Sequence, residues 1–207
     1  MADSENRAKT WSRFGKIAGC LILVAAGLFV LFRAIPRYRF NAIVLHHSAS
    51  SADNYESIKT FHAGSRGWRD AAYHLILANG STSVPSGFLE ATGRYRLLSY
   101  SPATKDHWAN LRALHLCIVG NYDNGEVPAG LRSSLAHALR ALQEKYGIPD
   151  DRILFHRDCN GTACPGRFIT KAKLNLWLTK EADKCPPAVR RQQGEVIGSA
   201  WTFPRLL

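Results

Sequence analysis

Short apolar runs of strand length alternate with helical patterns between residues 40 and 180, and this alternation limits the folds that the chain can adopt. Residues 42–45 and 114–119 are rich in Ile, Val and Leu and are predicted to be buried strands. Residues 128–146 place Leu and Ala on one helical face and stop at Gly147. Strands that alternate with helices pack as a sheet covered by helices. The sequence therefore predicts an α/β domain with a central mixed β-sheet flanked by helices.

Further elements complete this prediction. Asp53 is the expected N-cap of a helix that runs to about residue 62, with Glu56 as its capping-box partner. From residue 181 the chain shows no periodicity, so we expect a poorly ordered tail over 181–207. The remaining predictions are strands at 71–78, 88–90 and 153–155, a Gly/Cys/Pro-rich loop at 157–166, and a helix at 168–178.

An apolar run near the N-terminus carries no charge over sixteen residues, 17–32, and is bracketed by Lys16 and Arg33. As a helix it would span about 24 Å, and residues up to 36 can extend it towards the roughly 30 Å of a bilayer core. The sequence predicts a transmembrane anchor at 17–36 behind a short basic N-terminus at 1–16. A cleaved signal peptide and a buried core helix are the alternatives, although the flank after the run lacks the small-x-small pattern of a cleavage site.

The charge of the chain supports this division. The 27 Lys and Arg residues exceed the 16 Asp and Glu residues, which gives a net charge of +11. Five of these charges lie within residues 1–39, around the apolar run, and five lie on the domain predicted at 40–180. The charge predicts anionic partners, and no nucleic-acid recognition motif accompanies it. The length suits one domain with appendages.

Two histidines follow two separate predicted strands. His46 or His47 ends the strand at 42–45, and His156 ends the strand at 153–155. Cys164 comes eight residues after His156, in a loop that can fold back. Two imidazoles and a thiolate form a three-ligand zinc set that leaves the fourth position open. Partly buried histidines and an ordinary thiol are the alternative interpretation of this spacing.

Four motifs occur in order at residues 44–50 (VLHHSAS), 67–74 (GWRDAAYH), 116–121 (LCIVGN) and 155–166 (FHRDCNGTACPG). Together they resemble the type-2 family of zinc-dependent N-acetylmuramoyl-L-alanine amidases, which includes bacteriophage T7 lysozyme and the peptidoglycan recognition proteins. The resemblance covers about residues 42–180. It implies an amidase-type domain over 40–180 and the α/β fold of that family.

The resemblance also assigns roles to individual residues. It implies that His46, rather than His47, binds Zn2+ together with His156 and Cys164. It places the catalytic tyrosine of the family at Tyr73. The residue two positions before the zinc cysteine, which also acts in catalysis in the family, falls on Thr162.

The chain departs from the family pattern in two places, and in one of them Ala71-Ala72 replaces the more usual glycine before Tyr73. Many relatives carry Gly-Ala-His before the strand at 114–119, whereas this chain has SYSPATK at 99–105 and a histidine at His107. We interpret His115 as structural and His74 as a core or supporting residue. Asp158 is expected either to orient a ligand or to form a turn.

Two cysteines remain outside these assignments. Cys159 lies in the loop at 157–166 and Cys185 follows the last predicted helix. In an oxidising compartment these two thiols could form a disulfide.

The expected function is zinc-dependent hydrolysis of the amide between N-acetylmuramic acid and L-alanine in peptidoglycan. We expect a monomer that is attached to a membrane through its N-terminal helix, with the catalytic domain outside the cytoplasm. Its partners would be peptidoglycan and muropeptides, and not nucleic acid. The alternatives are a non-catalytic peptidoglycan-recognition module and a phage-type endolysin with the same chemistry.

Overall fold

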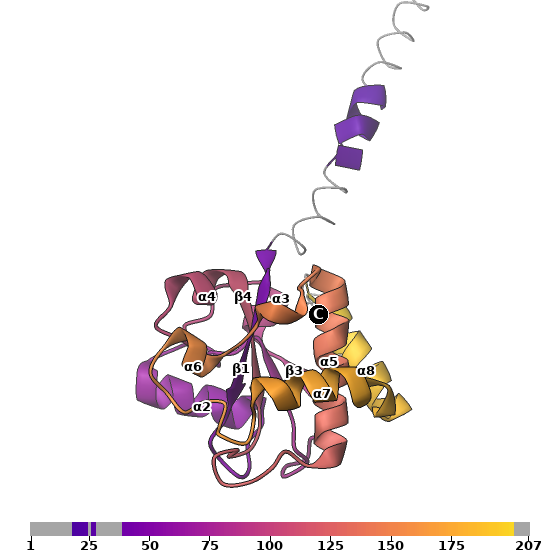
Figure 1. Ribbon diagram of the computed structural model, residues 1–207. Coiled ribbons are helices and arrows are strands. Elements are labelled where there is room, and N and C mark those ends of the chain that lie inside the picture. Colours follow the sequence, from indigo (N-terminus) through magenta and orange to yellow (C-terminus); the bar gives the residue numbers. More distant parts are fainter. Residues whose placement is uncertain (1–17, 25, 28–38, 201–207) are drawn as a thin grey trace, which may run out of the picture. The chain divides into compact units, whose positions relative to one another are not determined.

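The computed structural model describes residues 18–24, 26–27 and 39–200 (Figure 1). The chain divides into two units, residues 1–38 and 39–207, which are described separately. In the first unit, residues 18–24 and 26–27 are helical. In the part of the chain that the structure describes, no helix has the length and apolar character needed to cross a bilayer. Most of the anchor predicted at 17–36 lies outside the described residues.

The second unit is built on a five-stranded mixed sheet with the strand order β3-β2-β4-β1-β5. Its central strands are β1 (Ala42–His47) and β4 (Ala113–Ile118), which pair in parallel. β2 (Leu75–Leu77) and β5 (Ile153–Phe155) extend the parallel part on either side. β3 (Leu89–Ala91) pairs antiparallel with β2 and forms one edge. The predicted mixed α/β sheet is confirmed.

Helices cover both faces of this sheet, as Figure 1 shows around β1. The larger core lies on the face covered by α5 (Ala129–Tyr146) and α7 (Lys171–Lys180), where alternate strand residues such as Leu45 and Leu116 meet the leucines of these helices. On the other face, α2 (Tyr55–Arg66) and α4 (His107–Arg112) cover smaller clusters. Because neighbouring strand residues point to opposite faces, His46 points towards the α2 and α4 side.

The start of α2 differs from the prediction. The N-cap is Asn54 and not Asp53, because the Asn54 side chain accepts a hydrogen bond from the Ser57 backbone N–H at 2.9 Å. The Ser57 hydroxyl accepts the Asn54 N–H in return, also at 2.9 Å, so Ser57 replaces Glu56 in the capping box. The helix ends where Gly67 adopts a φ of 66°, a left-handed conformation that suits glycine.

Several short elements differ from the prediction. The strand predicted at 71–78 is shorter in the structure, where β2 has three residues and residues 71–74 are irregular. The segments that connect the strands also contain short helices that were not predicted. They contain α3 (Gly93–Arg96), α4 and α6 (His156–Cys159), each of six residues or fewer.

The prediction of a poorly ordered tail is wrong for residues 182–200. This part of the tail contains α8 (Pro187–Gly198), which packs against α5 and β3. The Gln193 side chain is fully buried and donates to the carbonyl oxygens of Gly87 and Ser134 at 2.7 and 3.0 Å. Gln192 accepts from the Leu89 N–H at 2.9 Å and donates to the Leu89 carbonyl at 2.7 Å. Helix α8 thus takes the place of a further strand beside the edge strand β3.

Cys159 and Cys185 do not form a disulfide. All five cysteines lie within the described residues and are free thiols. Cys159 packs beside Ala42 and Val44 on one face of the sheet, whereas Cys185 is buried and hydrogen-bonded to Ser134 of α5 on the other face. The sheet therefore lies between the two thiols.

The pairing of Gln192 with β3 predicts a measurable contribution to stability. We expect Gln192→Ala to lower the free energy of unfolding by about 1–3 kcal/mol, because both backbone groups of buried Leu89 lose their partner. Arg191→Ala is the matched control on the same helix, since Arg191 is exposed, and should change stability by less than about 0.5 kcal/mol. Urea unfolding of both variants checks this; equal midpoints for the two would contradict it.

Candidate metal centre

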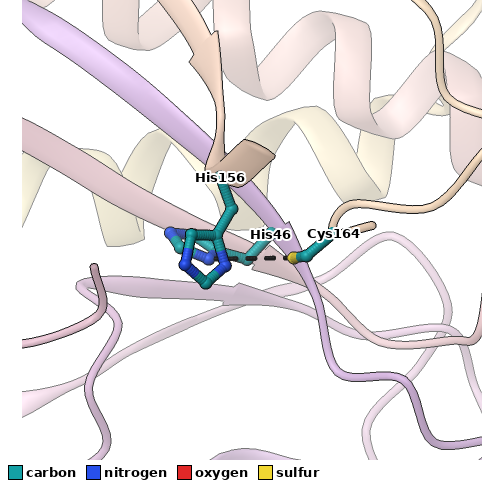
Figure 2. A group of neighbouring side chains, drawn as sticks. All are labelled: His46, His156 and Cys164. Carbon is teal, nitrogen blue, oxygen red and sulfur yellow. Dashed lines mark hydrogen bonds between the residues drawn. The ribbon is translucent and has the colours of Figure 1, made fainter. Parts of the chain in front are cut away.

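Three side chains that could hold a metal ion meet where β1 and β5 end. The donor atoms that His46, His156 and Cys164 offer all lie within 4.8 Å of one another. Figure 2 shows the three side chains converging from separate segments. The sequence-predicted ligand set is therefore brought together, and the structure separates His47 from it by directing that side chain to the opposite face of β1.

Strand register explains how the two histidines meet. Leu45 of β1 pairs with Phe155 of β5 in parallel, so the residues that follow them, His46 in β1 and His156 just after β5, lie side by side. Their ring centroids are 4.6 Å apart. His156 is also the first residue of α6, where the chain turns away from the sheet.

The loop that carries Cys164 is tied down by Arg157. The Arg157 backbone N–H donates to the Cys164 carbonyl at 3.0 Å. Its guanidinium donates to the carbonyls of Ala163 and Gly166, both at 3.1 Å, and to that of Ile169. Arg157 thus holds the loop in the fold-back that sets Cys164 beside the strand ends.

Gly166 is required where this loop approaches its neighbour. It has a φ of +104°, and a Cβ there would lie 2.4 Å from the backbone carbonyl carbon of Tyr122. A side chain at this position would therefore push the cysteine loop away from the loop that follows β4.

The Cys164 thiol is buried, and a backbone N–H group contacts its sulfur. Cys164 is 9% exposed, and its Sγ accepts the His47 backbone N–H at 3.3 Å. Burial raises the pKa of the Cys164 thiol to about 11, and the His47 hydrogen bond opposes this rise. The thiol therefore keeps its proton at neutral pH until a cation displaces it.

His46 is fully buried, and its two ring nitrogens face different partners. Its Nδ1 lies 3.9 Å from Cys164 Sγ, and its Nε2 lies 3.0 Å from His115 Nδ1. Burial holds the pKa of His46 well below its usual value, with His115 and His156 adding to the effect. His46 is therefore neutral at pH 7, the form in which imidazole binds metals.

His156 is half-buried, and burial also lowers its pKa. The Asn160 side-chain amide lies 2.9 Å from His156 Nε2. Because Asn160 Oδ1 accepts the Lys105 backbone N–H at 3.1 Å, its NH2 group is the one that faces the imidazole. The segment before α4 therefore contacts the second histidine through Asn160.

Two residues that the resemblance assigns to catalysis lie near this group. The Tyr73 ring centroid is 5.0 Å from that of His46, and burial raises the Tyr73 pKa well above its usual value, so the phenol stays protonated. Thr162 precedes Cys164 by two residues, and its hydroxyl oxygen accepts the Cys164 N–H at 3.3 Å. The Thr162 hydroxyl hydrogen remains available as a donor.

Two neighbouring residues have structural roles. Asp158 accepts the Phe155 N–H at 2.8 Å and pairs with Lys171 at 3.3 Å, so it forms a turn and does not orient a ligand. His74 is a core residue that accepts the His115 N–H at 3.0 Å through Nδ1.

Sequence reasoning missed the contacts of His115, Asn160 and Arg157. The interpretation of His115 as structural did not anticipate its contact with His46, because that contact depends on which strands are neighbours. Arg157 and Asn160 lie inside the motif at 155–166, so their place in this motif was the sequence feature that could have identified them.

A groove of about 280 Å³ opens beside Tyr73. It is lined by polar and apolar side chains, those of Ser48, Ser50, Asp53, Ile58, Phe61, His62 and Tyr73. A larger hollow of about 710 Å³ lies between α3, β3 and α8 and includes none of the three donor residues. The lining of the smaller groove also lacks the donor residues, but this groove adjoins the candidate metal centre through Tyr73, whose ring centroid is 5.0 Å from that of His46.

The donor set fits zinc. Tetrahedral zinc with bonds of about 2.0–2.3 Å places its ligand atoms about 3–4 Å apart, close to the separations found here. Two nitrogens and one sulfur match the ligand preference of this ion, and three protein ligands leave one position for water or substrate.

Solved structures of similar fold come from bacteria, phages and insects. An N-acetylmuramoyl-L-alanine amidase, LysC, from Clostridium intestinale is 23% identical, with a TM-score of 0.54, and the match covers 70% of this chain and 88% of that one. The Ph2119 endolysin of a Thermus scotoductus bacteriophage is 21% identical (TM-score 0.53; 68% and 85% covered). Drosophila PGRP-LB is 19% identical (TM-score 0.52; 67% and 84% covered). At these identities the similarities show the fold.

The family is shown by the sequence itself. No curated protein matches the chain. Residues 36–167, more than half of the chain, match the profile of the Amidase_2 family, described as N-acetylmuramoyl-L-alanine amidase. With its mixed five-stranded sheet and its His-His-Cys cluster, the chain belongs to the Amidase_2 family of N-acetylmuramoyl-L-alanine amidases.

Proposed function

We propose that the chain is a zinc-dependent N-acetylmuramoyl-L-alanine amidase that hydrolyses the amide between the lactyl group of N-acetylmuramic acid and L-alanine in peptidoglycan. The observation that carries this proposal is the convergence of His46, His156 and Cys164 beside Tyr73 in a member of this family. A binding module would not need three converging metal donors. Peptidoglycan as the partner is supported at the level of the family, and PGRP-LE, a protein of similar fold, has been solved in complex with tracheal cytotoxin.

Different residues of the chain would bind the metal and stabilise the negative charge in such a reaction. His46, His156 and Cys164 would hold the ion. When bound, zinc would supply a Lewis acid that polarises the amide carbonyl and lowers the pKa of water. The protonated Tyr73 phenol and the Thr162 hydroxyl would donate hydrogen bonds to the negative charge that develops on the carbonyl oxygen.

The groove beside Tyr73 supports a glycopeptide substrate. Ser48, Ser50 and Asp53 offer polar groups, and Ile58 and Phe61 offer apolar surface. Phe61 is 68% exposed, which is unusual for a large apolar side chain and leaves its ring open to a ligand.

Digestion of purified muropeptides tests this function. We expect the zinc-loaded chain to release free stem peptide, identified by mass spectrometry, and Cys164→Ala to release none. Muropeptide binding without release would instead identify a recognition module. Lysis of the host on expression would favour a phage-type endolysin with the same chemistry.

In the same assay, Tyr73→Phe separates the catalytic role from zinc binding. We expect kcat to fall about 10²–10³-fold because one hydrogen bond to the developing charge is lost. Zinc content should stay unchanged. Tyr55→Phe is the matched control, since it removes a hydroxyl that bonds Asp70 and lies outside the groove. Equal rates for Tyr73→Phe and wild type would remove Tyr73 from the mechanism.

Zinc affinity should depend on pH. In the metal-free protein the Cys164 thiol has a pKa of about 11 and is protonated at pH 7–9, whereas the lowered pKa values leave His46 and His156 neutral. Binding therefore releases one proton, and the apparent association constant should rise about tenfold per pH unit between pH 7 and 9.

Competition with a chromophoric chelator at three pH values measures this slope. Cys164→Ala is the control, and it should bind zinc weakly and without the slope. An affinity of the wild type that does not change with pH would contradict a protonated thiol in the metal-free state.

We also propose that residues 17–36 anchor the domain to a membrane, with the domain on the extracytoplasmic side where peptidoglycan lies. The uncharged run at 17–32 between Lys16 and Arg33 supports this proposal. We expect the full chain, expressed in a bacterium, to stay in the salt-washed membrane fraction and to be open to protease in spheroplasts. A variant that lacks residues 1–38 should be released as a soluble protein. A shortened, soluble form of the full chain would instead indicate a cleaved signal peptide.

A further inference from the structure

The fully buried His46 ring is held from the side opposite Cys164. Its Nε2 lies 3.0 Å from His115 Nδ1, and the two rings stack with centroids 5.2 Å apart. His115 is fully buried on β4, the strand that pairs with β1. A contact between two imidazoles can form in either direction, so the next contact of His115 decides which nitrogen carries the hydrogen.

That next contact is a carbonyl oxygen. His115 Nε2 lies 3.1 Å from the backbone oxygen of Ala109. A carbonyl only accepts, so His115 Nε2 carries the hydrogen, and Nδ1 of the neutral ring holds a lone pair. His46 Nε2 must then donate to His115 Nδ1. The remaining nitrogen, His46 Nδ1, therefore presents its lone pair towards Cys164 Sγ, 3.9 Å away.

The His115 ring lies between two other imidazole rings. Its own backbone N–H donates to His74 Nδ1 at 3.0 Å, and His74 Nε2 donates to the Ser99 carbonyl at 2.9 Å. The rings of His74 and His115 lie 5.7 Å apart, so three histidine rings form a buried row that ends at His46.

The carbonyl that orients His115 lies in α4, just after the segment at 99–105 where the chain departs from the family pattern. Ala109 belongs to α4, directly after residues 99–105. Buried Asn110 fixes this segment by accepting the Thr104 N–H at 3.0 Å and donating to the Thr104 carbonyl at 2.8 Å. The Asn110 side chain therefore helps to place the Ala109 carbonyl that orients His115.

We propose that His115 is a positioning residue that fixes His46 in the form with hydrogen on Nε2, so that Nδ1 is the atom that binds the metal. The inference deepens the proposed function and rests on its zinc site. A metal-binding histidine usually donates its second N–H to a carboxylate, a carbonyl or water, and here an imidazole anchored on Ala109 takes that place.

The metal-free wild type provides the first test, which needs no substitution. Long-range 1H–15N NMR distinguishes a protonated ring nitrogen from one with a lone pair. We expect hydrogen on Nε2 of both His46 and His115, and a lone pair on Nδ1 of both. Hydrogen on His46 Nδ1 would overturn the proposal.

Two amide substitutions form a matched pair for the second test. In His115→Asn the side-chain oxygen can occupy the place of Nδ1 and still accept from His46. In His115→Gln the amide reaches the place of Nε2, keeps the Ala109 contact and leaves His46 without its acceptor. Both variants place one neutral amide in the same buried position, so their folding costs are comparable, and circular dichroism and urea unfolding check this.

The readout is the zinc dissociation constant from chelator competition. We expect His115→Gln to weaken zinc binding about 10–100-fold, and His115→Asn to stay closer to wild type. Equal affinities of wild type and His115→Gln, or equal losses in both variants, would overturn the acceptor role. If wild type binds zinc tightly, shows this pattern and yet releases no stem peptide, the proposed function fails while the role of His115 stands.

Discussion

Parallel pairing of β5 with β1 is the interaction on which the candidate metal centre depends. Two parallel neighbours end at the same edge of a sheet, and the register of Leu45 against Phe155 sets the next residue of each strand, His46 and His156, side by side. A shift of one residue in this register would turn one histidine to the opposite face. The core on the α5 side enforces the register, because Leu45 and Phe155 are both buried there. Packing on one face of the sheet therefore positions the donors on the other.

A buried donor side chain also needs hydrogen-bond partners, and the surrounding residues supply them. A buried imidazole has two nitrogens, and each needs a partner of the right kind. His46 finds one partner in His115 and leaves the other nitrogen to face Cys164, while His47 turns away and supplies its backbone N–H to the same sulfur. Adjacent residues of one strand thus serve the site differently, one by its ring and the other by its backbone.

The sequence predicted the parts of this site that depend on local pattern. Short apolar runs predicted the strands β1, β4 and β5. The motifs at or just after the ends of β1 and β5 predicted His46, His156 and Cys164. Other features depend on partners far along the chain. Helix α8 buries two apolar side chains, Val189 and Ile197, and is also stabilised by Gln192 and Gln193. The partners of these glutamines lie about a hundred residues earlier or on α5, so the sequence of α8 alone resembles a disordered tail.

The segment at 99–112 reaches both histidines of the centre, through different intermediaries. Ala109 acts on His46 through His115, and the Lys105 backbone N–H acts on His156 through Asn160. Both contacts begin at backbone atoms, so they depend on the conformation of the segment more than on its side chains. A relative with a different segment here must satisfy its first zinc histidine in another way. A histidine at position 115 can orient His46 in this way only where a carbonyl such as that of Ala109 lies within reach.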